Sequence, residues 1–170
     1  MTVVGAVIKY RGAKPSLPAK QFTPIKKDGF DHIARMWFLD YRPKHFTRAG
    51  AREYGYAPRV GELLPRASKA FRRSYYGRKL KKLGHADPLV FSGASKRATA
   101  AATIVAFGTG SRIKMPAGNL RWRNKHSKID MMDEMRRVSA SEVQALTEAL
   151  DKRIQGGLNA NRDASQEKIA

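Results

Sequence analysis

Apolar residues recur at helical spacing between residues 28 and 41, and this pattern predicts an amphipathic helix. Asp28 stands where such a helix would need an N-cap, and Pro43 is expected to end it. A stripe of aromatic side chains can bind a ligand, but packing in a core is its commoner role. The stripe consists of Phe30, Ile33, Ala34, Trp37, Phe38 and Tyr41.

The residues before this helix predict extended structure. Residues 2–10 are rich in β-branched and apolar side chains, which favours a strand. Residues 12–27 contain three prolines and scattered lysines, a composition typical of an extended connector. On this pattern the chain divides into a strand and arm at 1–27, a single α+β domain at 28–157 and a flexible tail at 158–170.

A second, strongly basic helix is predicted at 67–83. Leu80 and Leu83 lie on one of its faces, and lysines and arginines surround them. Gly84 follows where a left-handed C-cap would stand. The apolar run at 89–91 then predicts either a short buried strand or a buried anchor.

The middle of the chain predicts a β-hairpin. β-forming residues at 99–107 and alternating residues at 112–115 flank a turn at 108–111. The chain is therefore expected to contain this hairpin as well as the helices. Residues 117–128 follow as a long basic loop, and loops of that length inside a domain tend to be functional or mobile.

The C-terminal helix has the clearest start in the sequence. Ser139 and Glu142 have the spacing of a capping box, with Val138 and Val143 as a hydrophobic staple around it. The Gly156–Gly157 pair is expected to stop the helix. Its predicted buried stripe is Val143, Leu146, Leu150 and Ile154.

The charge of the chain is concentrated. The 170 residues carry a formal net charge of +20, and residues 41–82 alone hold thirteen lysines and arginines against two acids. Such a charge favours nucleic acid, an anionic membrane or an acidic protein as partner. Six bases of the second predicted helix are expected to face a polyanion, namely Arg72, Arg73, Arg78, Lys79, Lys81 and Lys82.

Aromatic residues are interleaved with these bases, and two interpretations remain open. The rings could stack on the nucleobases of a single-stranded nucleic acid while the lysines and arginines contact its phosphates. Alternatively, the rings pack inward beneath a solvated basic face. The aromatic residues concerned are Phe46, Tyr54, Tyr56, Phe71, Tyr75 and Tyr76.

No residue pattern predicts an enzyme, a cofactor or a metal site. The chain has no cysteine, which excludes disulfides and thiolate ligands, and its four histidines lack metal-ligand spacing. It contains no P-loop, dinucleotide fingerprint or nucleophile elbow. The acids Asp130, Asp133 and Glu134 are expected to be exposed to solvent. No apolar stretch approaches the ~20 residues that span a bilayer, so we expect no membrane partner.

Six segments between residues 45 and 155 follow one another in a recognisable order. They are the segment Tyr54–Tyr56, the basic helix ending in Lys-Leu-Gly-His at 82–85, the run Pro88–Gly93 closed by Ser-Gly, a hairpin, the strand end Ile113–Pro116, and the capped helix after Val138. This order resembles the small neck, tail-completion and virion-morphogenesis proteins of long-tailed bacteriophages and prophages. The resemblance implies an α+β fold without catalytic residues, assembled as a hexameric or dodecameric ring at the head–tail junction.

Charge and resemblance together predict a non-enzymatic virion protein that assembles in the host cytoplasm. It would bind itself and neighbouring connector or tail proteins, and its basic face would meet double-stranded DNA, without sequence recognition, or an acidic neighbour. Arg121, Trp122 and Arg123 would form an assembly loop against another subunit. The alternative is a basic RNA-binding protein of the ribosomal type, whereas a nuclease is disfavoured because acids and histidines do not cluster.

Overall fold

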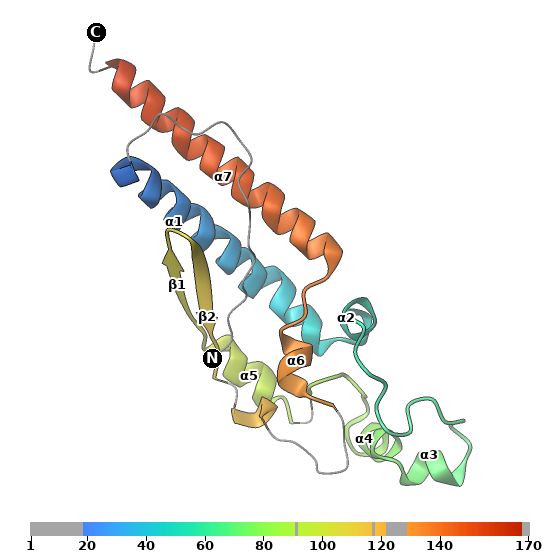
Figure 1. Ribbon diagram of the computed structural model, residues 1–170. Helices are drawn as coiled ribbons and strands as arrows, with labels where there is room; N and C mark the ends of the chain where they lie inside the picture. Colours follow the sequence, from blue (N-terminus) through green and yellow to red (C-terminus); the bar gives the residue numbers. More distant parts are fainter. Residues whose placement is uncertain (1–18, 91, 117, 122–128, 168–170) are drawn as a thin grey trace. The chain divides into compact units, whose positions relative to one another are not determined.

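The computed structural model describes residues 19–90, 92–116, 118–121 and 129–167, with the side chains of all but Ala19, Asn119 and residues 162–167. The chain forms a small α+β fold of helices and a two-stranded antiparallel sheet (Figure 1). It divides into two compact units. Unit 1 takes in Met1–Tyr41, Ala102–Lys114 and Val138–Ala170, and unit 2 takes in Arg42–Ala101 and Met115–Arg137.

Unit 1 is organised around helix α1 (Ala19–Met36). The long helix α7 (Ala140–Glu167) packs along α1, and so does the hairpin of β1 (Thr103–Phe107) and β2 (Gly110–Lys114) (Figure 1). In the hairpin, Thr103 pairs with Lys114 and Phe107 pairs with Gly110, which confirms the predicted hairpin with a shorter first strand. Helix α1 is therefore the shared partner of both other elements.

Two glycines allow α1 and α7 to approach closely. A Cβ placed on Gly29 would lie 2.9 Å from Leu150 Cδ1, and one placed on Gly157 would lie 2.7 Å from Ile25 Cγ2. Real Cβ atoms do not come this close to another carbon, so larger residues would push the helices apart. The core around this contact consists of Ile25, Ile33, Leu150 and Ile154, with Phe22, Phe30, Leu146, Ala149 and Leu158 packed against it.

The start of α1 corrects two predictions. The helix begins at Ala19, so residues 19–27 are not an extended connector and Asp28 is not an N-cap. Pro24 lies inside the helix, where a proline costs about 3 kcal/mol. Burying Ile25 and Ile33 contributes about 1.5–3 kcal/mol each, which is enough to offset that cost. The expected strand at 2–10 lies outside the described residues.

The end of α1 also differs from the prediction of one regular helix up to Pro43. The α-helix ends at Met36 and continues as a π-helical stretch, η1 (Trp37–Tyr41). A 3₁₀ helix, η2 (Arg42–Phe46), begins unit 2 and includes Pro43. The apolar positions at 30, 33, 34 and 37 nevertheless follow the predicted stripe, and Ile33, Ala34 and Trp37 are buried.

The amino end of α7 confirms the predicted capping box. Glu142 N donates to Ser139 Oγ at 3.3 Å, and Ser139 N donates to Glu142 Oε2 at 3.3 Å. Two other predictions for this helix are wrong. Val143 is half exposed instead of buried, and the helix runs through Gly156 and Gly157 to Glu167. A left-handed C-cap needs a positive φ, and neither glycine has one.

Unit 2 consists of short helices joined by turns. Its small apolar core contains Phe71, Tyr76 and Ala86, with Leu80 packed against them, and the rings of Phe71 and Tyr76 meet edge to face. Besides η2, its helices are α2 (Arg48–Glu53), α3 (Lys69–Arg73), α4 (Tyr75–Leu83), α5 (Ala94–Ala100), η3 (Gly118–Leu120) and α6 (Met131–Met135).

The helix predicted at 67–83 is two helices, α3 and α4, separated by Ser74. The Ser74 backbone is extended, and its Oγ accepts from Gly77 N at 3.0 Å as the N-cap of α4. Its own N–H donates to Ala70 O and Phe71 O and so closes α3. A Cβ on Gly77 would lie 2.1 Å from Phe71 O, so this tight break needs the glycine.

The segment after α4 confirms one prediction and overturns another. Gly84 has a φ of 71° and donates its N–H to Leu80 O at 2.9 Å, as expected of a left-handed C-cap. Of the two expectations for this run, residues 89–90 do not form a strand, whereas Leu89 is buried as an anchor would be. Leu89 has a φ of 54°, which belongs to a turn, and Phe91 lies outside the described residues.

A buried histidine lies in the core of unit 2. His45 is fully buried, stacks on the ring of Tyr54 at a centroid distance of 4.0 Å, and places Nδ1 2.5 Å from the Tyr56 hydroxyl. Burial lowers the pKa of His45 to about 4, although a backbone hydrogen bond at Glu134 and the charge of Glu53 act in the opposite direction. The fold therefore holds His45 in its neutral form.

The paired glycines of α7 give a matched test of the helix contact. Gly156 has open space around its Cα, so Gly156→Ala should stabilise the protein by about 0.5–1 kcal/mol through helix propensity. Gly157→Ala should instead destabilise it, because the new methyl meets the stiff, buried Ile25. Thermal or urea unfolding measures both changes. Equal stabilisation by the two substitutions would contradict the packing of α1 on α7.

The neutral state of His45 predicts a pH-dependent stability. The unfolded chain binds a proton near pH 6.5 and the folded chain only near pH 4, so stability is complete above 6.5 and declines as the pH falls toward 4. This histidine can account for about 3 kcal/mol of that loss at most. We expect urea unfolding of His45→Gln to be less pH-dependent than that of the parent. His32→Gln, at an exposed histidine, is the control and should keep the parent's profile.

Candidate nucleic-acid interface

Most of the positive charge belongs to unit 2. Its residues include 21 lysines and arginines against six acids, a net +15. Unit 1 has 13 bases against eight acids, a net +5. Unit 2 is therefore the part of the chain in which a surface for an anionic partner is to be sought.

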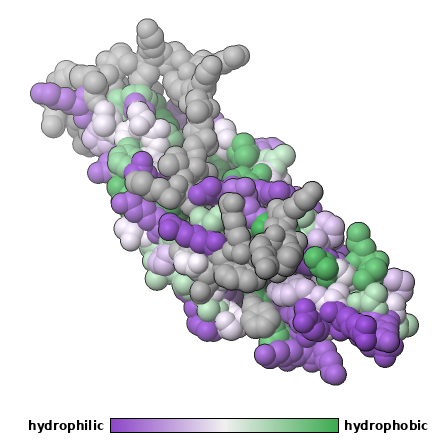
Figure 2. Space-filling model, turned by 60° about the horizontal axis from the view of Figure 1, so that its bottom comes forward, coloured by the Kyte–Doolittle hydropathy of each residue, from purple (hydrophilic) through white to green (hydrophobic). Residues whose placement is uncertain are grey.

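Five of the six predicted polyanion-facing residues are exposed. Arg72 and Arg73 end α3, and Arg78, Lys81 and Lys82 lie on α4. Exposed Arg66 and Lys69 extend this surface toward the start of α3. We call the seven residues the basic face; in Figure 2 the end of unit 2 that carries α3 is strongly hydrophilic, with hydrophobic surface beside it.

Four members of the basic face are not neutralised by the rest of the described structure. Arg72 and Arg78 make long hydrogen bonds of 3.4 Å to the backbone carbonyls of Ala67 and Ser74. Arg73 and Lys81 take part in none of the ion pairs that the described residues form, and the same holds for Arg72 and Arg78. Their charges are therefore available to an external anion.

Lys79, the sixth predicted residue, is buried, so its assignment to this surface is wrong. Only 6% of it is exposed, and its Nζ donates to the backbone carbonyl of Asp87. The reason lies in the helix period, because Lys79 follows Tyr76 by three residues and thus shares the inner face of α4. Burial, and then the charge of Arg59, lowers the pKa of Lys79 to about 8.

The interleaved aromatic residues mainly pack inward. Phe46, Tyr54, Phe71 and Tyr76 are buried, whereas Tyr75 is 43% exposed. Arg48 donates to the Tyr76 hydroxyl at 2.6 Å, which occupies the polar end of that ring as well. Of the two interpretations of this pattern, the structure supports a solvated basic face over buried aromatics. An array of rings for stacking on a single strand is not present among these residues.

A buried ion pair holds the segment before α3 against α6. Arg59 donates through both terminal nitrogens to Glu134, at 2.7 and 2.6 Å. Glu134 is buried, contrary to the prediction that this acidic segment is exposed. Asp130 caps α6 by accepting from Met132 N at 2.9 Å. No pattern in the sequence links Arg59 to Glu134, because the pair joins residues 75 positions apart.

The predicted assembly loop is described in part. Arg121 is exposed and follows η3, whereas Trp122 and Arg123 lie outside the described residues. The role of these residues at another subunit stays a prediction.

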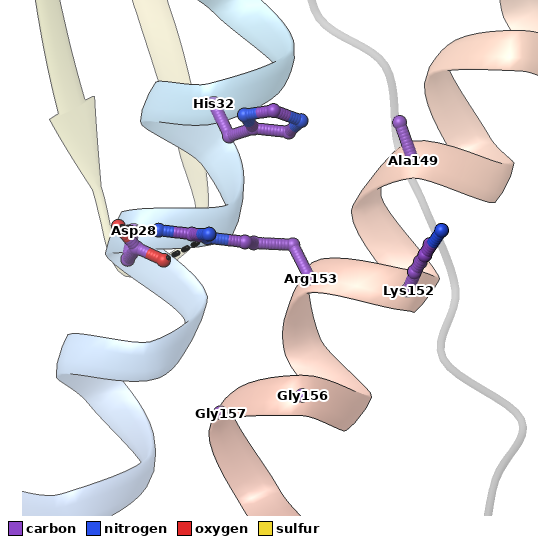
Figure 3. Close-up of a pocket in the computed structure, with 7 residues that line it drawn as sticks. All are labelled: Asp28, His32, Ala149, Lys152, Arg153, Gly156 and Gly157. Carbon is purple, nitrogen blue, oxygen red and sulfur yellow. Dashed lines mark hydrogen bonds and ion pairs between the residues drawn. The ribbon is translucent and has the colours of Figure 1, made fainter. Parts of the chain in front are cut away.

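A shallow hollow of about 580 Å³ lies between α1 and α7 in unit 1. Figure 3 shows the Arg153 side chain reaching from α7 to Asp28 on α1, where Nε and Oδ2 are 2.6 Å apart. This hydrogen bond lowers the pKa of Asp28, and both side chains are more than half exposed. Gly156 and Gly157 line the hollow, and its Arg153 is already paired with Asp28, so we do not regard it as a functional site.

The described residues contain no group of three or more histidine, aspartate and glutamate side chains that could hold a metal ion. None of their helices is both long enough and apolar enough to cross a membrane. Comparisons with protein family models, with curated proteins and with solved structures found no match to this chain.

The Arg59–Glu134 pair predicts a large effect of a small substitution. Glu134→Gln leaves a mostly buried guanidinium without its counter-charge and should cost about 3–5 kcal/mol. Asp133→Asn is the matched control, because Asp133 is exposed and 3.6 Å from Arg136, a contact worth less than about 1 kcal/mol. Urea unfolding compares the two. Similar small decreases in stability would show that the buried pair does not support unit 2.

Proposed function

We propose that this chain is a non-enzymatic structural protein of a tailed-phage virion. It forms a ring at the head–tail junction, as neck, tail-completion or tail-terminator protein, with the basic face toward DNA or an acidic neighbouring ring. The ring and its place in the virion are supported by the order of sequence segments between residues 45 and 155. The polyanion partner is supported by Arg72, Arg73, Arg78 and Lys81 on α3 and α4, which form no ion pair with the described residues.

The charge distribution supports contact with the phosphates of a nucleic acid rather than with its nucleobases. Long Lys and Arg side chains reach phosphate oxygens in any sequence, and such contacts position a nucleic acid without reading it. Each phosphate contact releases condensed counterions, so the affinity should fall steeply as salt rises. A duplex that moves through a ring needs this kind of contact, because base-specific hydrogen bonds would favour one position along the DNA.

The inward packing of the aromatics favours double-stranded over single-stranded partners. Single-strand binders combine a basic groove with exposed rings, each worth about 1–3 kcal/mol per stacked base. On the basic helices, Tyr75 is the aromatic residue that is substantially exposed. The alternative, an RNA-binding protein of the ribosomal type, therefore becomes one outcome of the test that follows.

The test neutralises four charges in each unit. One variant carries Arg72, Arg73, Arg78 and Lys81 changed to Gln, and its matched control carries Lys20, Lys27, Lys114 and Lys152 changed to Gln. All eight residues are exposed, so folding should be unaffected. For double-stranded DNA, we expect the slope of log affinity against log salt to fall by about 1 for each phosphate that the first variant no longer neutralises, and much less in the control.

The outcomes separate the possible partners. Equal decreases in both variants would show binding to net charge alone and would contradict a defined basic face. Unchanged DNA binding together with blocked particle assembly would identify an acidic neighbouring protein as the partner. Tighter binding to RNA than to duplex DNA would favour the ribosomal-type alternative. Sedimentation of the protein with its neighbours tests the ring, which a permanently monomeric protein would contradict.

A further inference from the structure

A cavity of about 610 Å³ lies beside α4 in unit 2, apart from the basic face. Two cations line it, Lys79 and Arg59, and Ser92 and Ser95 add hydroxyl groups. Most of the remaining wall is apolar, and Tyr75 stands at the cavity with 43% of its surface exposed. The volume falls in the range of about 300–1,000 Å³ that is usual for small-molecule sites.

The state of Lys79 is the unusual feature of this cavity. A buried ammonium is costly unless a carboxylate or another anion pairs with it. Lys79 forms no ion pair among the described residues, and its hydrogen-bond partner is the neutral backbone carbonyl of Asp87. One acceptor leaves two of its three N–H donors to spare. The amine is thus buried at a cavity wall with unused donors.

The neighbouring charges do not compensate Lys79. The carboxylates of Asp87 and Glu62 raise its pKa, but burial and the guanidinium of Arg59 outweigh them. Arg59 is itself held by Glu134 at 2.6 Å, so this buried carboxylate is already paired with another cation. The cavity wall therefore keeps a net positive charge that an entering anion would balance.

We propose that this cavity binds a small organic phosphate, with Lys79 Nζ contacting the phosphate oxygens. A phosphate offers several acceptors, and the wall offers several donors in the ammonium and the hydroxyls of Ser92 and Ser95. Inorganic phosphate alone would leave most of the volume empty. An organic body of nucleotide size would fill it, in contact with Tyr75 and the apolar wall formed by Leu89, Val90 and Met131.

The proposed site is independent of the proposed DNA contact. The cations of the basic face are exposed and can contact the phosphates of a duplex as it moves. Lys79 is only 6% exposed and cannot reach the backbone of a DNA duplex. The two functions can therefore fail separately, and the variants that remove each of them do not overlap.

Calorimetric titration of the full chain with adenosine 5′-monophosphate is the primary experiment. Inorganic phosphate, adenosine and glucose 6-phosphate are titrated beside it to separate the phosphate from the body that carries it. We expect saturable binding of the nucleotide with a Kd of about 1 mM or tighter, and weaker binding of the other three. Binding of glucose 6-phosphate as tight as that of the nucleotide would identify the ligand as a sugar phosphate within the same class.

Three variants assign the binding to the cavity. Lys79→Met should weaken it at least tenfold, whereas Lys81→Gln, an exposed cation two residues further along α4, should leave it unchanged. Ser92→Phe places a large ring in the cavity wall and keeps Lys79, so it should also abolish binding, which keeps the test decisive if Lys79→Met does not fold. All three should retain the salt-dependent DNA affinity of the parent, apart from a small decrease for Lys81→Gln.

Two results would overturn the proposal. One is the absence of saturable binding by any of the phosphates up to about 10 mM, a Kd that corresponds to less than about 3 kcal/mol of binding free energy. The other is nucleotide binding that survives Ser92→Phe, or that Lys81→Gln weakens as much as Lys79→Met. If the variant of the basic face no longer binds DNA but still binds the nucleotide, this inference stands on its own.

Discussion

The scarcity of carboxylates is the constraint on which unit 2 depends. Six acids face 21 bases there, and the fold uses its acids for internal tasks. Glu134 holds Arg59 in a buried pair, Asp130 caps α6, and Glu62 accepts from the backbone N–H of Arg59 at 2.8 Å. With these acids committed, Arg72, Arg73, Arg78 and Lys81 form no ion pair with the described residues. The small number of carboxylates in unit 2 therefore has two consequences. Glu134 is used in the buried pair that stabilises the unit, and the surface keeps the positive charge that makes it a candidate interface.

Unit 1 has a different organisation, in which steric fit between two helices replaces charge. Gly29 and Gly157 let α1 and α7 approach until Ile25 and Leu150 meet the opposite backbone. A helix interior glycine costs roughly 1 kcal/mol in propensity, so its presence at both ends of one contact is informative. The close approach gives α1 and α7 a continuous apolar core. Burial of this core stabilises α1 enough for the helix to include Pro24.

The buried and exposed cations of unit 2 have different physical roles. An exposed base on α3 or α4 costs little and contributes little to folding, so its value lies in what it attracts from outside. Lys79 is costly where it stands, since burial shifts its pKa to about 8. The burial of Lys79 at a cavity destabilises the fold, whereas the exposed cations of the basic face do not. Lys79 is therefore more informative about binding than these exposed cations are. This difference is why the two proposals rest on separate residues.

Local signals in the sequence were enough to predict the hairpin, the capping box of Ser139 and Glu142, and the left-handed cap at Gly84. They also located the basic segment that forms most of the candidate interface. Each of these features depends on residues a few positions apart, whose interactions are the same in almost any fold. The tertiary structure decided where α1 and α7 extend, why the basic helix breaks at Ser74, and which charges are buried. Those outcomes depend on contacts between residues far apart in the chain, where the burial of several side chains outweighs a local preference of about 1–3 kcal/mol.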